Sequence, residues 1–440
     1  MLLQSVGPQF KERRQKLMKS HPTAGFILPS AEEVLRNPDV PFPFRQESNF
    51  FYLSGFEEPE SCLVLAPEGN SFKTILFVRK RDQEREMWDG ERYGIDGALK
   101  VFGADEAYLI SELDQRLPGI LKNCEKVYYR MGLNESQDRR MLSALETWRR
   151  SQGRSGTGLA PILDPSSAIG EMRLFKRPEE AQIMRKAGHY SAMAHLEAMK
   201  QTRPGMNEFE VEALIDYQFR KQGCQRVGYG SIVAGGRNST CLHYRSNNEV
   251  LKDGDLLLID AGGELDYYTA DITRTFPVGK KFTDAQAKAY DLVLKSQKEA
   301  IAMTQPGVRM TDIHRRVCEI LIEGCLSLGL LKGNAEEILR SNEYQRFYPH
   351  RTSHWLGMDV HDLGLYQLNG EPRRLEAGMV FTIEPGFYVQ PTDKDAPAAF
   401  RNIGIRIEDD ILVTDNGCEV LTKDVPKDRE EIERIRAAAY

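Results

Sequence analysis

Two aspartates lie in one short and otherwise apolar stretch of the chain. Asp260 and Asp271 occur in LLLIDAGGELDYYTADITRTF, where residues 262–266 mark a hairpin turn between two strand-like runs. A turn centred on Leu265–Asp266 places the two carboxylates opposite each other, with Cβ atoms roughly 4.5–5.5 Å apart. Carboxylates so close repel each other, so the pair needs a shared proton or a cation. Taken alone, an aspartate that caps a turn or faces water is an equally good interpretation.

Two further acids are set in strongly apolar strand-like runs, where an unpaired charge is costly to bury. Glu384 lies in MVFTIEPGFYV and Glu408 in GIRIEDDILVT. The chain has eight histidines, and three of them fall within the twelve residues HRTSHWLGMDVH, namely His350, His354 and His361. This density predicts a functional cluster. The histidines in helices or in a polar segment fit ordinary core or surface roles (His21, His189, His195 and His314).

The donor set predicts a metal centre. Four carboxylates and one imidazole suit a pair of hard or borderline divalent ions such as Mn²⁺, with Zn²⁺ or Co²⁺ as alternatives. Two such ions about 3.5–4 Å apart can share a bridging water, lower its pKa and polarise a carbonyl group for attack. The chemistry indicated is metal-assisted hydrolysis, which requires no covalent nucleophile.

The C-terminal half of the sequence contains two similar segments that would position these residues. Thr-Arg-Pro-Gly at 202–205 and Thr-Gln-Pro-Gly at 304–307 each precede an amphipathic helix. The strand-like runs 253–262 and 377–386 each end in a carboxylate followed by glycine. Pro-Gly turns are common, yet a duplicated helix, helix, strand, strand unit predicts an α+β domain with pseudo-two-fold symmetry. Its curved antiparallel sheet would be covered by helices on one face, with the acids on the open face.

The first part of the chain predicts a separate domain. Residues 1–172 mix strand-like runs with polar helical stretches, which indicates a smaller α/β domain. The stretch 153–168 is rich in Gly, Ser and Pro, so the boundary falls there or just after it. We expect domains at 1–172 and 173–440, with a helix beginning at Arg177–Glu180 where proline takes the first helical position.

Composition argues against several classes of protein. The net charge is −6 and the basic residues are scattered, so no surface for nucleic acid or anionic membrane is predicted. Seven cysteines without a Cys-x-x-Cys pair argue against a disulfide framework and a thiolate zinc site. No apolar run has the length of a membrane span, and the N-terminus lacks a signal-like pattern. We therefore expect a cytoplasmic protein that acts on a small molecule or a peptide.

Four segments together resemble a known family. IDAG-x8-DITRTF, HWLGMDVHD, IEPG and GIRIEDD are similar to the pita-bread metallopeptidases, and within them to the Xaa-Pro aminopeptidases (aminopeptidase P). PFPFRQESNFFYLSGFEEPE, at 41–60, is similar to the N-terminal domain of that subgroup. The resemblance implies a dinuclear aminopeptidase that cleaves between an N-terminal residue and a following proline by means of a metal-bridging water or hydroxide. It also implies peptide substrates with proline second, a homodimer or homotetramer, and an N-terminal domain that serves substrate access or oligomerisation.

Roles for the five metal ligands follow from the same resemblance. Asp260 would hold one ion, Asp271 and Glu408 would bridge both, and His354 with Glu384 would hold the other. Glu384 would also carry a proton from the bridging water to the leaving nitrogen, a general acid/base role.

Roles around the substrate are implied in the same way. His361 and His243 match histidines that hold the substrate and stabilise the tetrahedral intermediate, and His350 matches one that lines the proline pocket. Arg406 and Tyr388 correspond to residues that orient the metal-bound carboxylates; solvent-facing strand residues are the competing interpretation.

Two further residues, Arg351 and Trp88, lie in segments that are similar to the family. Arg351 follows His350 where many relatives carry a small residue, which affects the width and charge of the substrate pocket. Trp88 resembles a residue that can reach an active site in an oligomer, although a packing role is the commoner case. A prolidase would use the same site, and the preference for the aminopeptidase depends on the block around Arg45–Gln46. A metal-free hydrolase of the creatinase type or a non-catalytic pita-bread module would lack the full ligand set.

Overall fold

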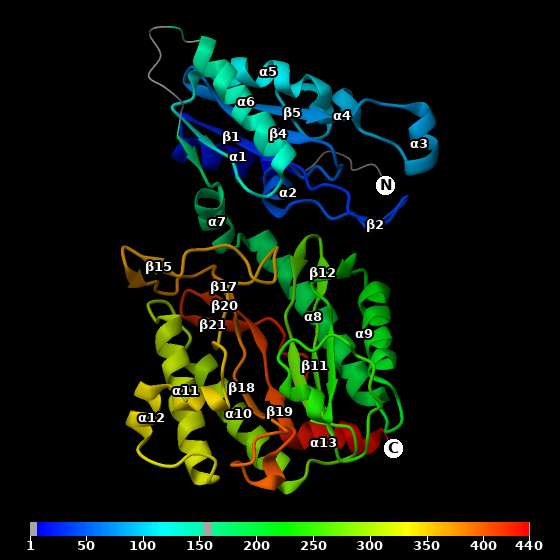
Figure 1. The fold of residues 1–440 in the computed structure, drawn as a ribbon, viewed down its shortest axis with the longest axis vertical. Helices are drawn as coiled ribbons and strands as arrows, with labels where there is room; N and C mark the ends of the chain where they lie inside the picture. The colour runs from blue at the N-terminus through cyan, green and yellow to red at the C-terminus, as the bar shows by residue number, and fades with distance from the viewer. Residues whose placement is uncertain (1–6, 152, 154–160, 440) are drawn as a thin grey trace. The chain divides into compact units, whose positions relative to one another are not determined.

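The structure is a computed structural model that describes residues 7–151, 153 and 161–439 (Figure 1). Packing divides the chain into two units, Met1–Met172 and Arg173–Tyr440. Each unit has its own hydrophobic core, so each is described by itself.

The N-terminal unit is built on a six-stranded mixed sheet with the order β6-β5-β4-β1-β7-β8. β4 runs antiparallel to β5 and β1, whereas the β5–β6, β1–β7 and β7–β8 pairs are parallel. Helices α5 and α6 cover the face that carries Ile27, Val64 and Phe77. The strands are β1 (Ala24–Pro29), β4 (Cys62–Glu68), β5 (Ser71–Val78), β6 (Glu106–Leu109), β7 (Lys126–Tyr128) and β8 (Ile162–Leu163), beside a short β2–β3 pair (Leu35–Asn37, Val40–Pro41). The helices are α1 (Gln9–Ser20), α2 (Ser48–Ser54), α3 (Gln83–Asp89), α4 (Gly94–Lys100), α5 (Leu113–Ile120) and α6 (Glu135–Ser151). The predicted α/β character of this unit is confirmed.

The helices of the C-terminal unit pack against its strands through single apolar stripes. α8 begins at Pro178, and the Glu180 carboxylate accepts the Arg177 N–H at 2.9 Å, so the predicted helix start is confirmed. The helices are α7 (Ser166–Leu174, which spans the border of the two units), α8 (Pro178–Gln201), α9 (Glu208–Gln222), α10 (Asp284–Met303), α11 (Met310–Ser327), α12 (Ala335–Ser341) and α13 (Arg429–Ala438).

The strands of this unit pair only in the antiparallel sense among the described residues. One set is β10-β11-β14 (Ile232–Gly235, Leu256–Asp260, Thr273–Pro277), and its counterpart is β17-β20-β21 (Val380–Ile383, Asp409–Thr414, Gly417–Val420). Between them lies the pair β18–β19 (Gly386–Val389, Ile403–Arg406). Two smaller sets are β13-β12-β9 (Tyr268–Thr269, Gly263–Leu265, Arg226–Val227) and β15–β16 (Gln367–Leu368, Glu371–Pro372).

The predicted duplication is visible in the hydrogen bonds that join helix and strand. The N–H of Gly205 donates to Leu251 O at 2.8 Å, and the N–H of Gly307 donates to Leu375 O at 2.8 Å. Both glycines have φ near 90°, a conformation that strains any residue with a Cβ atom. Two turns built alike and followed by equivalent helices confirm the pseudo-symmetric pita-bread fold.

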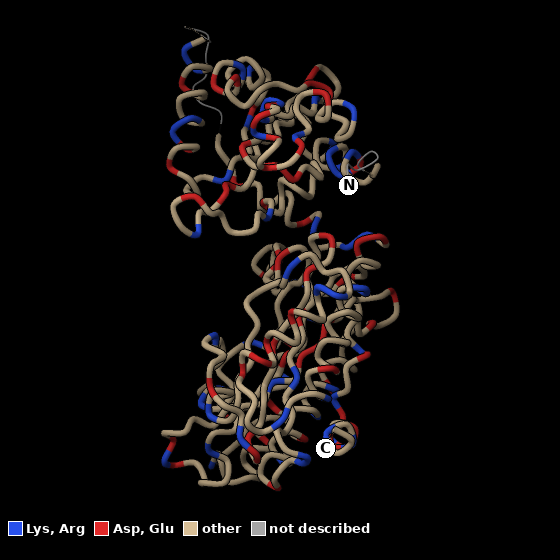
Figure 2. The backbone as a smooth tube through the Cα atoms, turned by 90° about the vertical axis from the view of Figure 1, so that its right-hand side faces the viewer, with Lys and Arg blue, Asp and Glu red and all other residues tan. Residues whose placement is uncertain are grey.

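Charged side chains are interspersed along both units, with acidic and basic residues alternating over short distances (Figure 2). Among the helices that the structure describes, none combines the length and the apolar composition needed to cross a lipid bilayer.

Candidate active site

The hairpin that carries the two aspartates is present, but its register differs from the prediction. Asp260 pairs with Thr273, because the turn is centred on Asp266–Tyr267, one residue later than expected. Both turn residues have positive φ, 47° and 70°, as in the two-residue turns that match strand twist. The predicted direct opposition of Asp260 and Asp271 is therefore wrong. A shift of two partner positions keeps both aspartates on one face, as diagonal neighbours.

A tyrosine that the sequence analysis missed joins the two aspartates. The Tyr229 hydroxyl lies 2.5 Å from Oδ1 of Asp260 and also contacts Oδ1 of Asp271. Burial and the charges of both aspartates raise the pKa of Tyr229 well above its usual range, so the hydroxyl keeps its proton. The single hydroxyl proton can form a full hydrogen bond with only one of the two carboxylates, so the pair still needs a further proton or a cation. In QRVGYGSIV no acid lies near the tyrosine in sequence, so only the fold reveals this contact.

The predicted metal ligands converge from separate segments into one cavity of about 410 Å³. Ligand atoms of Asp271, His354 and Glu408 lie within 4.8 Å of one another. Nε2 of His354 is 3.4 Å from Oδ2 of Asp271 and 3.4 Å from Oε1 of Glu384, which follows β17. Asp260, at the end of β11, lines the same cavity. Four carboxylates and one imidazole thus face a common space.

The orientation of His354 suits a metal ligand. Its Nδ1 lies 3.0 Å from the Trp355 carbonyl oxygen, which can only accept, so Nδ1 carries the hydrogen. The lone pair of Nε2 then points at two acids, an arrangement that requires a proton or a cation between them. Burial opposes charging of this ring, but the hydrogen bond with Asp271 and the charge of Glu384 raise the pKa of His354 to about 9.

The acids of the cavity carry more negative charge than the protein itself neutralises. Burial, and then the charges of neighbouring acids, raise the pKa of Glu408 well above its usual range. Burial likewise raises the pKa of Asp271, and it raises that of Glu384 to about 7. Without external cations these groups therefore tend to hold protons. A pair of divalent cations would remove this excess of negative charge, so the residues fit the predicted metals.

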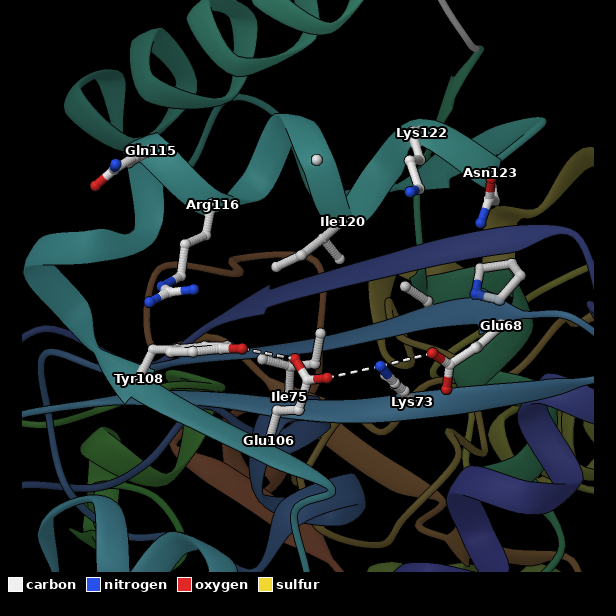
Figure 3. A pocket seen from close by; sticks show the side chains of 13 residues that line it. Glu68, Lys73, Ile75, Glu106, Tyr108, Gln115, Arg116, Ile120, Lys122 and Asn123 are labelled. Atoms are coloured by element: carbon white, nitrogen blue, oxygen red, sulfur yellow. Dashed lines mark hydrogen bonds and ion pairs between the residues drawn. The ribbon is translucent and has the colours of Figure 1, made fainter.

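A second cavity provides a comparison, because there basic side chains of the protein pair with the acids. In the N-terminal unit, a space of about 560 Å³ is lined by Glu68, Lys73, Glu106 and Tyr108 (Figure 3). Nζ of Lys73 lies 2.6 Å from a carboxylate oxygen of each glutamate. Arg116 and Lys122 line the same cavity, so three basic side chains balance the two acids without a metal ion, in contrast to the C-terminal unit.

Buried polar groups orient the carboxylates of the active site. Nη2 of Arg406 donates to Oδ2 of Asp260 at 2.6 Å, and its Nε donates to Oγ1 of Thr273 at 3.0 Å. Thr273 in turn donates to Oε2 of Glu408 at 2.6 Å. The hydroxyl of Tyr388 contacts Nη1 of Arg406 at 3.1 Å rather than a carboxylate. Arg406 was among the predicted residues, whereas Thr273 was not, because a threonine in a strand carries no signal of this kind.

Two acids next to Glu408 were also missed. The carboxylate of Asp410 accepts the N–H of Asp271 at 3.2 and 3.1 Å from its two oxygens. Asp409 points to the opposite face of the strand, where Arg274 lies at 2.7 Å and Lys427 at 2.6 Å. The run Glu-Asp-Asp at 408–410 could have predicted this arrangement. Side chains alternate between the two faces of a strand, so the first and third acids share a face and the middle acid points to the other.

The three predicted substrate histidines line the same cavity. The rings of His361 and His354 meet edge to face, with centroids 4.5 Å apart. Nδ1 of His350 lies 3.7 Å from Oε2 of Glu384, and its Nε2 lies 2.9 Å from the Tyr388 hydroxyl. His243 is exposed at the edge of the cavity. The structure thus brings together all the predicted residues around one space, with Tyr388 buried behind it.

Comparison with known proteins defines the class. Residues 182–415 match the model of metallopeptidase family M24, and residues 10–128 match that of the aminopeptidase P N-terminal domain. The chain therefore belongs to metallopeptidase family M24. The predicted resemblance and the enzyme class are confirmed.

Relatives within the family are similar over their full lengths. An Xaa-Pro aminopeptidase of Escherichia coli is 42% identical over 433 residues, or 98% of each chain. One of Haemophilus influenzae is 41% identical over 97% of this chain and 96% of its own. The structure of Pseudomonas aeruginosa aminopeptidase PepP is 44% identical, with a TM-score of 0.95 over 99% of each chain. Zinc-substituted E. coli aminopeptidase P in complex with product is equally similar, with a TM-score of 0.95 and 42% identity over 99% of each chain.

Proposed function

We propose that this chain is a dinuclear metal-dependent aminopeptidase that hydrolyses the bond between an N-terminal residue and a following proline. The observation that carries the proposal is the convergence in one cavity of four carboxylates and one imidazole, with Arg406 as the only arginine or lysine paired with these acids among the described residues. The names of the full-length relatives support the choice of substrate.

Five residues would hold the ions: Asp260, Asp271, His354, Glu384 and Glu408. Their oxygen-rich set favours Mn²⁺, with Zn²⁺ or Co²⁺ as alternatives. When bound, two such ions lower the pKa of a water molecule and polarise the scissile carbonyl group. The zinc-substituted state of the E. coli relative supports tolerance of more than one metal.

Glu384 would move the proton. The leaving nitrogen of an Xaa-Pro bond has no hydrogen, so it must gain a proton when the C–N bond breaks. A carboxylate at this position, between the metal ligands and His350, can take a proton from water and release it to an amine. His350, held by Tyr388, lies beside this carboxylate and would line the proline pocket.

Two histidines would act on the carbonyl side. Burial, followed by the charges of His354 and His243, lowers the pKa of His361, so its ring is neutral near pH 7. A neutral imidazole can donate an N–H to the developing oxyanion without adding a charge. His243, at the edge of the same cavity, would hold the substrate from the other side.

A prolidase remains the nearest alternative, because the metal site serves either substrate. The match to the aminopeptidase P N-terminal domain favours the aminopeptidase. We further propose that the N-terminal unit serves substrate access or oligomerisation, in a cytoplasmic homodimer or homotetramer. The resemblance to the family supports this, and light scattering on the purified protein would test it.

The test compares a tripeptide Xaa-Pro-Yaa with the dipeptide Xaa-Pro, after chelation and reloading with Mn²⁺. Release of the first residue from the tripeptide is expected, with two ions bound per chain. Activity confined to the dipeptide would favour a prolidase. Metal content near zero after reloading would overturn the proposal.

A further inference from the structure

Two arginines at the edge of the catalytic cavity lack an anionic partner. Arg245 and Arg351 both line the cavity and both are exposed. Among the described residues, neither side chain has an ion pair or a hydrogen bond. By contrast, Arg406 in the same cavity is buried against Asp260, and the nearby Arg346 pairs with Asp393. The guanidinium groups of the edge are thus free to bind a ligand.

The position of Arg351 is linked to the proposed proline pocket. Nδ1 of His350 donates to the Arg351 carbonyl oxygen at 2.8 Å, which fixes this part of the backbone next to the pocket. Arg351 also lines an adjoining cavity of about 420 Å³, together with His350, Ser353 and Tyr366 from the first cavity. Among the described residues, no aspartate or glutamate lines the adjoining cavity. Arg351 therefore lies between the acidic catalytic cavity and an adjoining space without acids, where a peptide would continue beyond proline.

Arg245 supplies a second cation to the same cavity. Its Nη1 lies 3.8 Å from the position that a Cβ atom would occupy on Gly230, another lining residue. The preceding residue is anchored, because the Tyr244 hydroxyl donates to Glu208 at 2.8 Å. The loop that carries Arg245 is thus held, while the guanidinium itself stays unpaired.

The cavity therefore has an acidic floor and a basic edge. A peptide with its amino end at the floor would present its downstream residues to the edge. An extended chain advances about 3.3–3.6 Å per residue, so the carboxylate of a third residue would lie roughly 7 Å from the scissile bond. Planar guanidinium groups match carboxylates through paired hydrogen bonds.

We infer that Arg245 and Arg351 bind a substrate carboxylate downstream of proline and so give the enzyme a preference for such substrates. The inference rests on the proposed function. The carboxylate has two sources, the free C-terminus of a tripeptide and an acidic side chain at the third position.

Two substrate pairs distinguish these sources. The first pair is Ala-Pro-Ala with a free C-terminus and the same peptide as its amide. The second pair is Ala-Pro-Glu amide and Ala-Pro-Gln amide. For the Mn²⁺-loaded wild type we expect kcat/KM to be about tenfold higher for the peptide with the carboxylate than for its neutral partner, in at least one pair. The difference should lie mainly in KM. Charge-assisted hydrogen bonds at an exposed edge do not support a larger ratio. Preference in the first pair identifies the C-terminus, and preference in the second identifies the side chain.

Variants connect the preference to the arginines. The double variant Arg245→Gln and Arg351→Gln should bring the ratio of the preferred pair close to one, because kcat/KM falls for the peptide that carries the bound carboxylate. Arg351→Lys in the otherwise unchanged chain should keep part of the ratio, because the charge remains and the paired geometry is lost. The control Arg434→Gln, which removes an exposed arginine of α13 that does not line the cavity, should leave the ratio unchanged.

Wild-type ratios within twofold of one in both pairs, or ratios that survive in the double variant, would overturn the inference alone. Failure of the wild type to cleave any of the four peptides would overturn the proposed function, and the inference with it.

Discussion

Replacement of Thr273 by valine would show whether the threonine hydroxyl orients Glu408 for metal binding or serves only to stabilise the fold. The hydroxyl donates to Glu408 at 2.6 Å and accepts from Nε of Arg406 at 3.0 Å, and the residue is fully buried. A hydrogen bond to an ionised partner is worth about 1.5–3 kcal/mol, against about 1 kcal/mol for a neutral one. Burial among other acids raises the pKa of Glu408 and so favours its protonated form without metal. The stronger hydrogen bond from Thr273 would therefore form when ions bind and the carboxylate ionises. Thr273→Val should therefore weaken metal binding about tenfold, a loss typical of groups that orient metal ligands.

The assay is calorimetric titration of the chelated protein with Mn²⁺, beside urea unfolding of the same sample. Unfolding should show a loss of about 2–3 kcal/mol, because one neutral bond is lost and an Arg406 N–H is left unpaired. Thr275→Val is the matched control: its hydroxyl contacts the N–H and carbonyl of Arg406 at 3.2 and 3.0 Å and no carboxylate. It should lose similar stability but keep metal affinity within twofold. Equal affinity losses in both variants would refute the reasoning.

Three further predictions concern the metal centre and its hairpin. Glu408→Ala should abolish both metal content and turnover, whereas Glu384→Gln should keep some metal and lose most turnover, with content and rate measured on one sample; near wild-type turnover in either would show the assigned role to be wrong. The raised pKa values of Glu384, from 4.5 to about 7, and of His354, from 6.5 to about 9, mean that the folded metal-free protein holds protons more tightly than the unfolded chain. The stability of the metal-free protein should therefore fall as the pH rises through this range. Its thermal unfolding midpoint should drop between about pH 5 and 9, the window set by these shifts, whereas the midpoint of the metal-loaded protein should not show this drop. Gly262→Ala places a Cβ atom 1.8 Å from the carbonyl oxygen of Ala270, so urea unfolding should show a loss of about 1–3 kcal/mol; an unchanged midpoint would contradict this packing.

Sequence patterns identified the strands and the main acids because burial of a carboxylate in an apolar run is costly and therefore informative. Asp260, Glu384 and Glu408 all follow or end such runs. The hairpin register was misjudged for a physical reason. The predicted turn ended its polar segment at Asp266 and was centred on Leu265–Asp266, yet the chain turns at Asp266–Tyr267, where a tyrosine adopts φ of 70°. Positive φ is unfavourable for such a residue, so local preference pointed elsewhere.

The residues that sequence analysis missed act through contacts between distant segments. Tyr229 reaches Asp271 across 42 positions of the chain, and Thr273 reaches Glu408 across 135. Neither type of residue is unusual in a strand or at its end, so neither marks a site by its identity. The Tyr229 contact forms when the first repeat folds, and the Thr273 contact forms when the two repeats pack together. Local periodicity specifies neither contact.

The duplication has a mechanical consequence. Two of the proposed ligands, Asp260 and Asp271, belong to the first repeat, and His354, Glu384 and Glu408 belong to the second. The seam between them is joined by the N–H of Glu408, which donates to Thr273 O at 3.0 Å. Ions held by ligands from both repeats would stabilise the packing of the repeats against each other. A change that separates the repeats would therefore also weaken metal binding. Binding of ions at the proposed centre and separation of the repeats would then be linked: each would oppose the other.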